Sequence, residues 1–453
     1  FQNNLMGAAA AAASAGSDFY DHQIANSCRF DGSSSELDRT PGSAGNRRTF
    51  TFSTWIKKVK NGVQQCFFSA GSGTFSDFEF DSSDRLSGHL ANGGTSFQST
   101  ALYRDPSAWY HFVVIMDTTQ GTADDRCKVY INGERITAWN TDPASTISQN
   151  YDWDFNNNVK HAIGYEHTGR RYFAGYLADT YMVDGTAKAI GDCGTTKNGV
   201  WIPDNPSGFT FGTNGFLINY ASSSDLGNDV SGNNNDFSAS GLSTHDQILD
   251  SPTFNSDSNG GNFCTYNPLN AGSYATLSEG NLKALGNTSS DIAMPSGTFA
   301  MTSGKWYFER LIANESSGYP YLGLAAIGNV AYNTNTGGDI WAMRFAPAAG
   351  TVAVNGTAAN VAGFGTITAT STGLATATTG DIIGFHLDLD NRKCWITKNG
   401  AFVNSGDPSA GTNPQWSWTE TPNNPISFID QIYNGTGSIL NAGQDGTFAG
   451  EKT

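Results

Sequence analysis

The sequence is short of charged residues, and above all of cations. Only 15% of its 453 residues are charged, and 25 Lys and Arg stand against 41 Asp and Glu, giving a net charge of -16. Binding to nucleic acid depends on clustered cations that displace counterions from phosphates, and no run of Lys or Arg occurs. We therefore expect no nucleic-acid partner.

Long apolar runs and metal-binding motifs are also missing. No apolar stretch reaches the roughly 18 residues of a membrane-spanning helix, so no membrane span is expected. The six cysteines lie far apart without a CxxC pair, which favours buried free thiols over disulfides or a zinc site. The seven histidines show neither HxH nor HExxH spacing, so no metal ligands are assigned.

What is abundant is glycine, with 53 residues, together with small polar residues that favour turns. Between these turns lie short apolar alternations typical of β-strands, for example at 49–57, 109–117 and 176–183. Asn-Gly pairs at 132–133 and 399–400 predict two tight hairpins. The pattern predicts an all-β protein of antiparallel sandwiches, with less than about a tenth of its residues helical.

The strand patterns of residues 18–225 resemble, in order, the laminin-G-like branch of the concanavalin A-like sandwich family. The resemblance is carried by TFTFSTWIKK (49–58), FDSSDRLSGHL (80–90), WYHFVVIMD (109–117), VYINGERI (129–136), HAIGYE (161–166) and FAGYLADTYMVDG (173–185). It implies a jelly-roll sandwich for this part of the chain.

A second series of strand patterns, in residues 263–453, resembles the SPRY domain, which is also a concanavalin A-like sandwich. Its motifs are GKWYFE (304–309), GDIIGFHLDLDNRKCWITKNG (380–400) and PISFID (425–430). The polar stretch 226–262 has few aromatic residues and is expected to connect the two tandem sandwiches.

Residues 1–17 form a separate N-terminal arm. They include the alanines 8–13 and lack the basic region and long apolar core of a signal peptide. Alone they cannot bury enough surface to offset their ordering entropy, so we expect the arm to anchor the chain to a partner, as in a homo-oligomer.

Candidate catalytic and metal-binding groups are few. Glu79 and Asp81 come nearest to the alternate carboxylates of sandwich-fold glycoside hydrolases, but we expect them in a solvent-facing structural hairpin. No GxSxG elbow or activated cysteine occurs, so no catalytic residue is assigned. The run DVSGNNND (229–236) offers enough oxygen for calcium, yet it is equally typical of a solvated turn, and calcium is left unassigned.

Aromatic residues supply the candidate ligand site. Rings in expected loops are suited to stacking on sugars or gripping an extended peptide. The candidates are Tyr319, Tyr321, Trp341, Trp416 and Trp418.

The sequence as a whole also resembles structural proteins of tailed bacteriophages, particularly marine ones. This resemblance rests on segments such as FQNNLMGAAA (1–10), PLNAGSYATLSEGNLKA (268–284) and NAGQDGTFAG (441–450). It implies a non-enzymatic virion component of tail-fibre, head-fibre or decoration type, exposed on the particle. The arm would contact other virion proteins, and the protein would adhere to a host-surface glycan or protein. The alternative is a secreted cellular adhesin or carbohydrate-active enzyme of the same fold.

Overall fold

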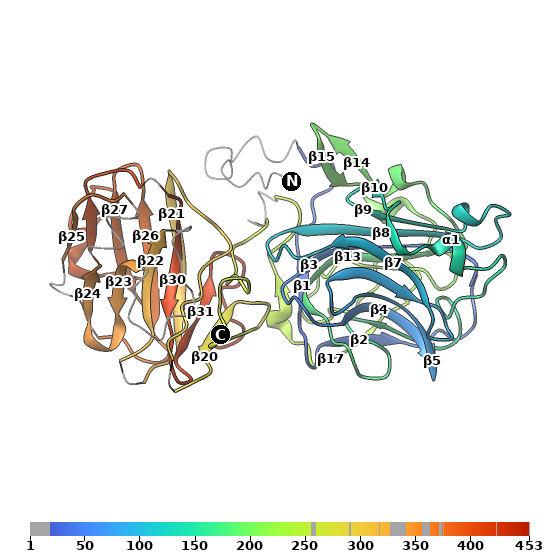
Figure 1. Cartoon of the computed structure of the whole chain (residues 1–453), viewed down its shortest axis with the longest axis horizontal. Helices are drawn as coiled ribbons and strands as arrows, with labels where there is room; N and C mark the ends of the chain where they lie inside the picture. The colour runs from blue at the N-terminus through green and yellow to red at the C-terminus, as the bar shows by residue number, and fades with distance from the viewer. Residues whose placement is uncertain are drawn as a thin grey trace. The chain divides into compact units, whose positions relative to one another are not determined.

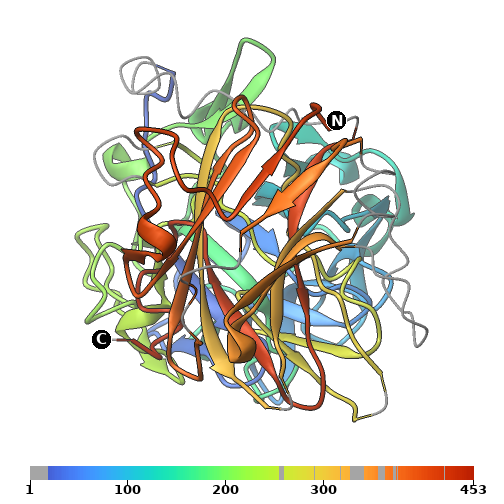
Figure 2. The ribbon, with the colours of Figure 1, turned by 90° about the vertical axis from the view of Figure 1, so that its left-hand side faces the viewer.

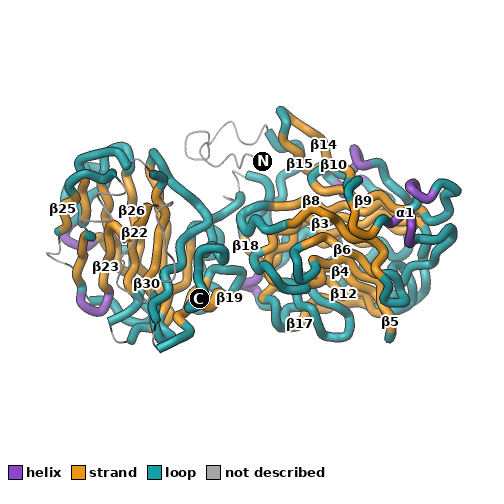
Figure 3. The backbone as a smooth tube through the Cα atoms, in the orientation of Figure 1, coloured by secondary structure: helices purple, strands orange, loops and turns teal. Residues whose placement is uncertain are grey.

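The computed structural model of the chain describes residues 19–254, 260–289, 291–316, 318–326, 341–355, 363–370, 374, 376–422 and 424–452. The expected arm, residues 1–17, lies outside them. The chain divides into two compact units, Phe1–Asn262 and Phe263–Thr453. Strands dominate both (Figure 1, Figure 3), and in the described residues α-helix is confined to the single turn α1 (Pro143–Thr146).

Unit 1 is a sandwich of two eight-stranded sheets, whose neighbouring strands pair antiparallel. Sheet A has the order β10 (Glu134–Arg135), β9 (Cys127–Ile131), β8 (Trp109–Asp117), β3 (Thr49–Lys58), β13 (Ala174–Asp184), β1 (Ser27–Asp31) and β18 (Gln247–Ile248), with β16 (Phe216–Ile218) beside β13. Sheet B has the order β11 (Trp139–Thr141), β7 (Thr95–Leu102), β6 (Arg85–His89), β5 (Thr74–Phe80), β4 (Gln65–Ser72), β12 (Lys160–Ile163), β2 (Glu36–Arg39) and β17 (Ser238–Ser240). A separate hairpin joins β14 (Gly194–Lys197) and β15 (Val200–Pro203).

Phenylalanine rings from both sheets meet in the core of unit 1. Phe52 of β3 stacks on Phe68 of β4 with ring centroids 4.3 Å apart, and Phe112 of β8 contacts Phe78 of β5 at 5.3 Å. All four side chains are fully buried. Burial of each contributes about 1.5–3 kcal/mol, so this aromatic layer holds the sheets together.

The described residues of the stretch 226–262, which the sequence analysis expects to connect the two sandwiches, belong to unit 1. β17 pairs with β2, and β18 pairs with β1. Past β18, Asp250 is fully buried, where its carboxylate accepts from Lys57 Nζ at 2.6 Å and from Trp109 Nε1 at 3.0 Å. The stretch is polar for two reasons: its strands lie at sheet edges, and its acidic residues pair with side chains of sheet A. In the sequence alone, such a polar stretch cannot be distinguished from a linker.

Unit 2 is a second antiparallel sandwich (Figure 2). Its sheet C has the order β19 (Ala275–Ser278), β20 (Lys283–Gly286), β31 (Gly437–Asn441), β21 (Lys305–Asn314), β26 (Ile382–Asp388), β27 (Lys393–Lys398), β29 (Trp416–Trp418) and β25 (Ile367–Ala369), with β28 (Ala401–Phe402) beside β27. The four-stranded sheet D has the order β24 (Thr351–Val354), β23 (Trp341–Ala346), β22 (Tyr321–Ala326) and β30 (Ile426–Gln431).

A buried ion pair links the two sheets of unit 2. Arg310 of β21 donates from Nη1 to Asp430 Oδ1 of β30, and from Nη2 to the carbonyl of Gly323 of β22 at 3.3 Å. Tyr266 Oη donates to Asp430 Oδ2 at 2.6 Å. Both charged side chains are fully buried, so their hydrogen bonds offset the cost of removing them from water.

The main sequence expectations for the fold are confirmed. Both Asn-Gly turns adopt positive φ, with 50° and 79° at Asn132 and Gly133 and 48° and 81° at Asn399 and Gly400. All six cysteines are free and buried. Among the described residues, no helix is long and apolar enough to cross a membrane.

Candidate functional site

An acidic pair lies on the outer face of sheet B. Because side chains alternate along a strand, Phe78 and Phe80 of β5 enter the core while Asp77 and Glu79 point to the opposite face. Their side chains are nevertheless only 0% and 1% exposed. The expectation that Glu79 lies on a solvent-facing hairpin is therefore wrong.

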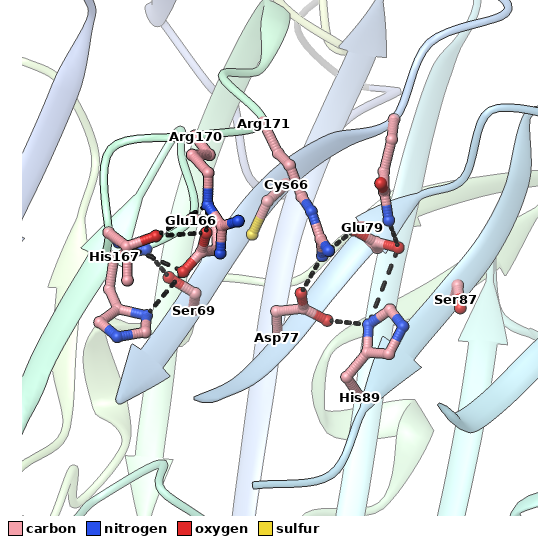
Figure 4. Close-up of polar contacts among 12 residues, drawn as sticks. Cys66, Ser69, Asp77, Glu79, Ser87, His89, Glu166, His167, Arg170 and Arg171 are labelled. Atoms are coloured by element: carbon pink, nitrogen blue, oxygen red, sulfur yellow. Dashed lines mark hydrogen bonds and ion pairs between the residues drawn. The ribbon is translucent and has the colours of Figure 1, made fainter. Parts of the chain in front are cut away.

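Two cationic or ionisable side chains cover this pair (Figure 4). Arg171 Nη1 lies 3.3 Å from Asp77 Oδ2 and 3.1 Å from Glu79 Oε2. His89 Nδ1, from β6, lies 2.7 Å from Asp77 Oδ1 and 3.7 Å from Glu79 Oε1. Gln64 Nε2 donates to Glu79 Oε1 at 2.7 Å. We call Asp77, Glu79, His89 and Arg171 the acidic cluster.

Burial and mutual charge shift the pKa values of the acidic cluster. Burial, reinforced by the charge of Asp77, raises the pKa of Glu79 to about 7. For His89, burial lowers the pKa, but the hydrogen bond and charge of Asp77 outweigh burial and leave it above the usual value. The cluster therefore changes its protonation near neutral pH.

The acidic cluster is not assigned as a metal or catalytic site. One potential ligand atom from each of Asp77, Glu79 and His89 lies within 4.8 Å of the others. Arg171, however, contacts both carboxylates and supplies the positive charge that a metal ion would bring. A glycosidase also needs its carboxylates to face the sugar, whereas these are covered by protein.

A buried Ser–His pair on the outer face of sheet A also fails a test for catalysis. Ser53 Oγ lies 2.7 Å from His111 Nε2, and Trp201 Nε1 donates to His111 Nδ1 at 2.9 Å. An indole nitrogen only donates, so Nδ1 of the neutral ring is unprotonated and Nε2 carries the proton. Burial lowers the pKa of His111 to about 3, which keeps the ring neutral. His111 thus donates to Ser53 and is in the wrong tautomer to act as its base.

The possible calcium run at 229–236 is organised by hydrogen bonds within the protein. Asp229 Oδ1 accepts from the backbone nitrogens of Leu217 and Ser231, and Oδ2 accepts from Asn235 N and Ser231 Oγ. Asn233 donates from Nδ2 to a carbonyl across the loop. These contacts give the run a structural role as a turn.

In unit 2, the expectation that Trp416 and Trp418 lie in loops is wrong. Trp416 and Trp418 form strand β29 and are 0% and 4% exposed. Trp416 lies 6.3 Å from Phe385 and Trp418 lies 5.5 Å from Phe364, measured between ring centroids. The alternation WSW places both rings on one face of a strand, which packs into the core.

The other three predicted residues gather on the outer face of sheet D. The centroids of Tyr319 and Tyr321 are 4.6 Å apart, and Tyr433 lies 5.5 Å from Tyr319. The guanidinium carbon of Arg344 lies 4.4 Å from the ring centroid of Tyr321 and 4.4 Å from that of Trp341. We call these five residues the tyrosine–arginine row.

The members of the row differ in exposure. Trp341 is buried against Ala325 and Ile429, whereas the three tyrosines and Arg344 are partly exposed. Trp341 and Arg344 are three residues apart, yet both lie over the same face of the sheet. The pairing of β22 with β23 shifts register between Leu324 and Ala325, which allows this arrangement. Sequence reasoning missed Arg344 because simple alternation places positions 341 and 344 on opposite faces.

Part of unit 1 matches a known protein family. Residues 31–189 match the model of the Concanavalin A-like lectin/glucanases superfamily. No curated protein matches the chain. Similar solved structures include a Bacteroides ovatus protein described as carbohydrate binding, with 14% identity, 48% of this chain covered and a TM-score of 0.33; the chain spans 58% of that protein.

Two other similar solved structures are covered by this chain over almost their whole length. The SPRY domain of human HERC1 has 17% identity and a TM-score of 0.28, with 39% of this chain and 98% of that domain covered. The heptameric SAP-like pentraxin of Limulus polyphemus has 16% identity and a TM-score of 0.30, with 49% and 97% covered. The laminin-G-like expectation is confirmed by the family match alone, which shows a concanavalin A-like domain at residues 31–189.

Proposed function

We propose that the protein is a non-enzymatic, lectin-like adhesin that binds a surface glycan at the tyrosine–arginine row. The observation that carries this proposal is the row itself: Tyr319, Tyr321 and Tyr433 are in ring contact and partly exposed, beside Arg344. Tyrosine offers a large ring with a polar tip at low entropic cost, which suits recognition of a ligand that is part apolar and part hydroxylated.

The acidic cluster supports a role without catalysis. Asp77 and Glu79, the alternate carboxylates of β5, are both buried beneath Arg171 and His89. Sheet B has another alternate pair, Glu36 and Asp38 of β2, which is partly exposed, and Asp38 pairs with Lys160 at 2.8 Å. The concanavalin A-like domain of unit 1 agrees with a lectin-type protein. Catalysis by Asp77 and Glu79 would require this cluster to open.

We place the adhesin on a bacteriophage particle, as a tail-fibre, head-fibre or decoration protein. This part of the proposal rests on the resemblance of the sequence segments to phage structural proteins. In it, residues 1–17 anchor the chain to other virion proteins, several copies assemble as a homo-oligomer, and unit 2 presents its ligand site. Deletion of residues 1–17 tests the anchoring: the truncated chain should fold but not enter particles.

A glycan array tests the binding site. Wild type should bind a subset of glycans, and Tyr321→Ala should lose that binding with an unchanged melting temperature. Tyr307→Ala is the matched control, because Tyr307 is an exposed tyrosine of sheet C, outside the row. Binding that survives Tyr321→Ala, or an array without any bound glycan, would refute the proposed site.

A further inference from the structure

We propose that Arg344 makes the tyrosine–arginine row selective for glycans that carry a carboxylate, such as uronic or sialic acids. This inference rests on the proposed function, since it specifies the ligand of the same site. It depends on how Arg344 is held, on which of its hydrogen-bond donors lack acceptors, and on the charge around it.

Arg344 is held in a fixed position by the rings on either side of it. Its guanidinium carbon lies 4.4 Å from the centroids of both Tyr321 and Trp341. Nη1 donates to Gln431 Oε1 at 3.2 Å, which sets the orientation of the guanidinium plane. Its two neighbours across the sheet are small, Gly323 of β22 and Ala353 of β24, so neither places a long side chain beside Arg344. A ligand would thus meet a cation whose conformational freedom is already restricted.

The guanidinium of Arg344 has hydrogen-bonding capacity left for a ligand. Within the described residues, its one hydrogen bond is the one from Nη1 to Gln431, and the side chain is partly exposed. Nε is enclosed without a partner, as is Nε of the core residue Arg310, so the ligand would meet the Nη atoms. A carboxylate is acceptor-only, and its two oxygens match the planar fork of a guanidinium, so this group suits the place better than a hydroxyl, which also has a proton to donate.

The charge around Arg344 distinguishes it from the buried arginines. Arg29 pairs with Asp246 at 2.9 Å, and Arg310 pairs with Asp430 in the core of unit 2. Among the described residues, no carboxylate pairs with Arg344, although acids outnumber cations in the chain. In a protein of net charge -16, an anionic ligand is repelled at long range, so its binding needs a local cation of this kind.

Matched neutral and acidic glycans test this inference. The probes are an array in which each uronic or sialic acid glycan is printed beside its methyl ester, which removes the charge and keeps the sugar ring. Wild type should prefer the acid by at least about tenfold in Kd, and Arg344→Gln should abolish that preference while it still binds the esters. Arg344→Lys should keep only part of it, because an ammonium lacks the planar fork.

Lys305→Gln is the charge-matched control, because it removes an exposed cation from sheet C of the same unit and should leave the preference intact. Equal binding of acids and esters by wild type, with both lost in Tyr321→Ala, would overturn this inference and leave the proposed function standing. A preference for acids that persists in Arg344→Gln would also overturn it. No binding to any member of the array would contradict both proposals.

Discussion

Arg171 Nη1 lies 3.1 Å from Glu79 Oε2, although the two residues are separated by 92 positions in the sequence. The same nitrogen contacts Asp77, so one guanidinium covers both carboxylates of β5. The alternate carboxylates of β5 resemble those of a sugar-cleaving strand, but this contact covers them and neutralises part of their charge. While this cover stays in place, neither carboxylate is exposed to solvent.

Removal of Arg171 should destabilise unit 1 strongly. Arg171→Met would leave two buried carboxylates without their shared cation, at a cost of about 3–5 kcal/mol in the free energy of unfolding. Urea unfolding followed by tryptophan fluorescence measures this cost. Arg48→Met is the control, because the Arg48–Asp152 pair is exposed on both sides and should contribute no more than about 1 kcal/mol. Equal effects of the two variants would contradict the account.

The acidic cluster should make the stability of unit 1 depend on pH. Burial raises the pKa of Glu79 to about 7, so between pH 4.5 and 7 the folded state binds more protons than the unfolded state. Stability from this group is therefore present at low pH and falls as the pH rises, by at most about 1.4 kcal/mol per pH unit for one proton. The pKa of His89 is also raised, and its contribution likewise falls as the pH rises through that value.

Glu79→Gln isolates the Glu79 contribution, since glutamine keeps the shape and does not titrate. The difference in unfolding free energy between wild type and Glu79→Gln should change steadily in favour of the variant from pH 5 to pH 7. The exposed Glu134→Gln should show no such trend. A difference that is constant with pH, or that changes in the opposite direction, would show that Glu79 is ionised throughout.

Residues 226–262 should be required for a stable first sandwich. A chain of residues 19–225 lacks Asp250, and Lys57 then loses the carboxylate that it contacts at 2.6 Å in the interior. We expect this fragment to unfold at lower urea concentration than residues 19–262, because it also loses two edge strands. If the two fragments unfold at the same urea concentration, residues 226–262 do not stabilise the first sandwich and act only as a connection.

Alanine substitutions of Trp416 and Tyr321 should affect different properties, stability in one case and glycan binding in the other. Trp416→Ala removes a fully buried ring and should cost about 3–5 kcal/mol in the stability of unit 2. Tyr321→Ala removes a partly exposed ring and should reduce glycan binding with little change in stability. Thermal unfolding and binding measured on the same samples separate the two roles.

Local patterns allowed the strands, the Asn-Gly hairpins and the buried cysteines to be predicted, because each depends on neighbouring residues. The acidic cluster could not be predicted, because Arg171 and His89 reach Asp77 from other parts of the chain. The one local signal was the alternation of Asp77, Glu79 and Asp81, of which Asp77 was missed. Of the five predicted aromatic residues, Tyr319 and Tyr321 lie together and are partly exposed. Trp341, Trp416 and Trp418 are buried strand residues instead, because short strands resemble loops in sequence.

The most direct test of the central claim is mass spectrometry of a glycan that the protein binds, recovered after prolonged incubation with wild type. If the protein binds without cutting, the glycan returns at its original mass, and Tyr321→Ala no longer retains it. Cleavage products that form with wild type and disappear with Glu79→Gln would show an active carboxylate pair, and would contradict the claim that this protein binds glycans without cutting them.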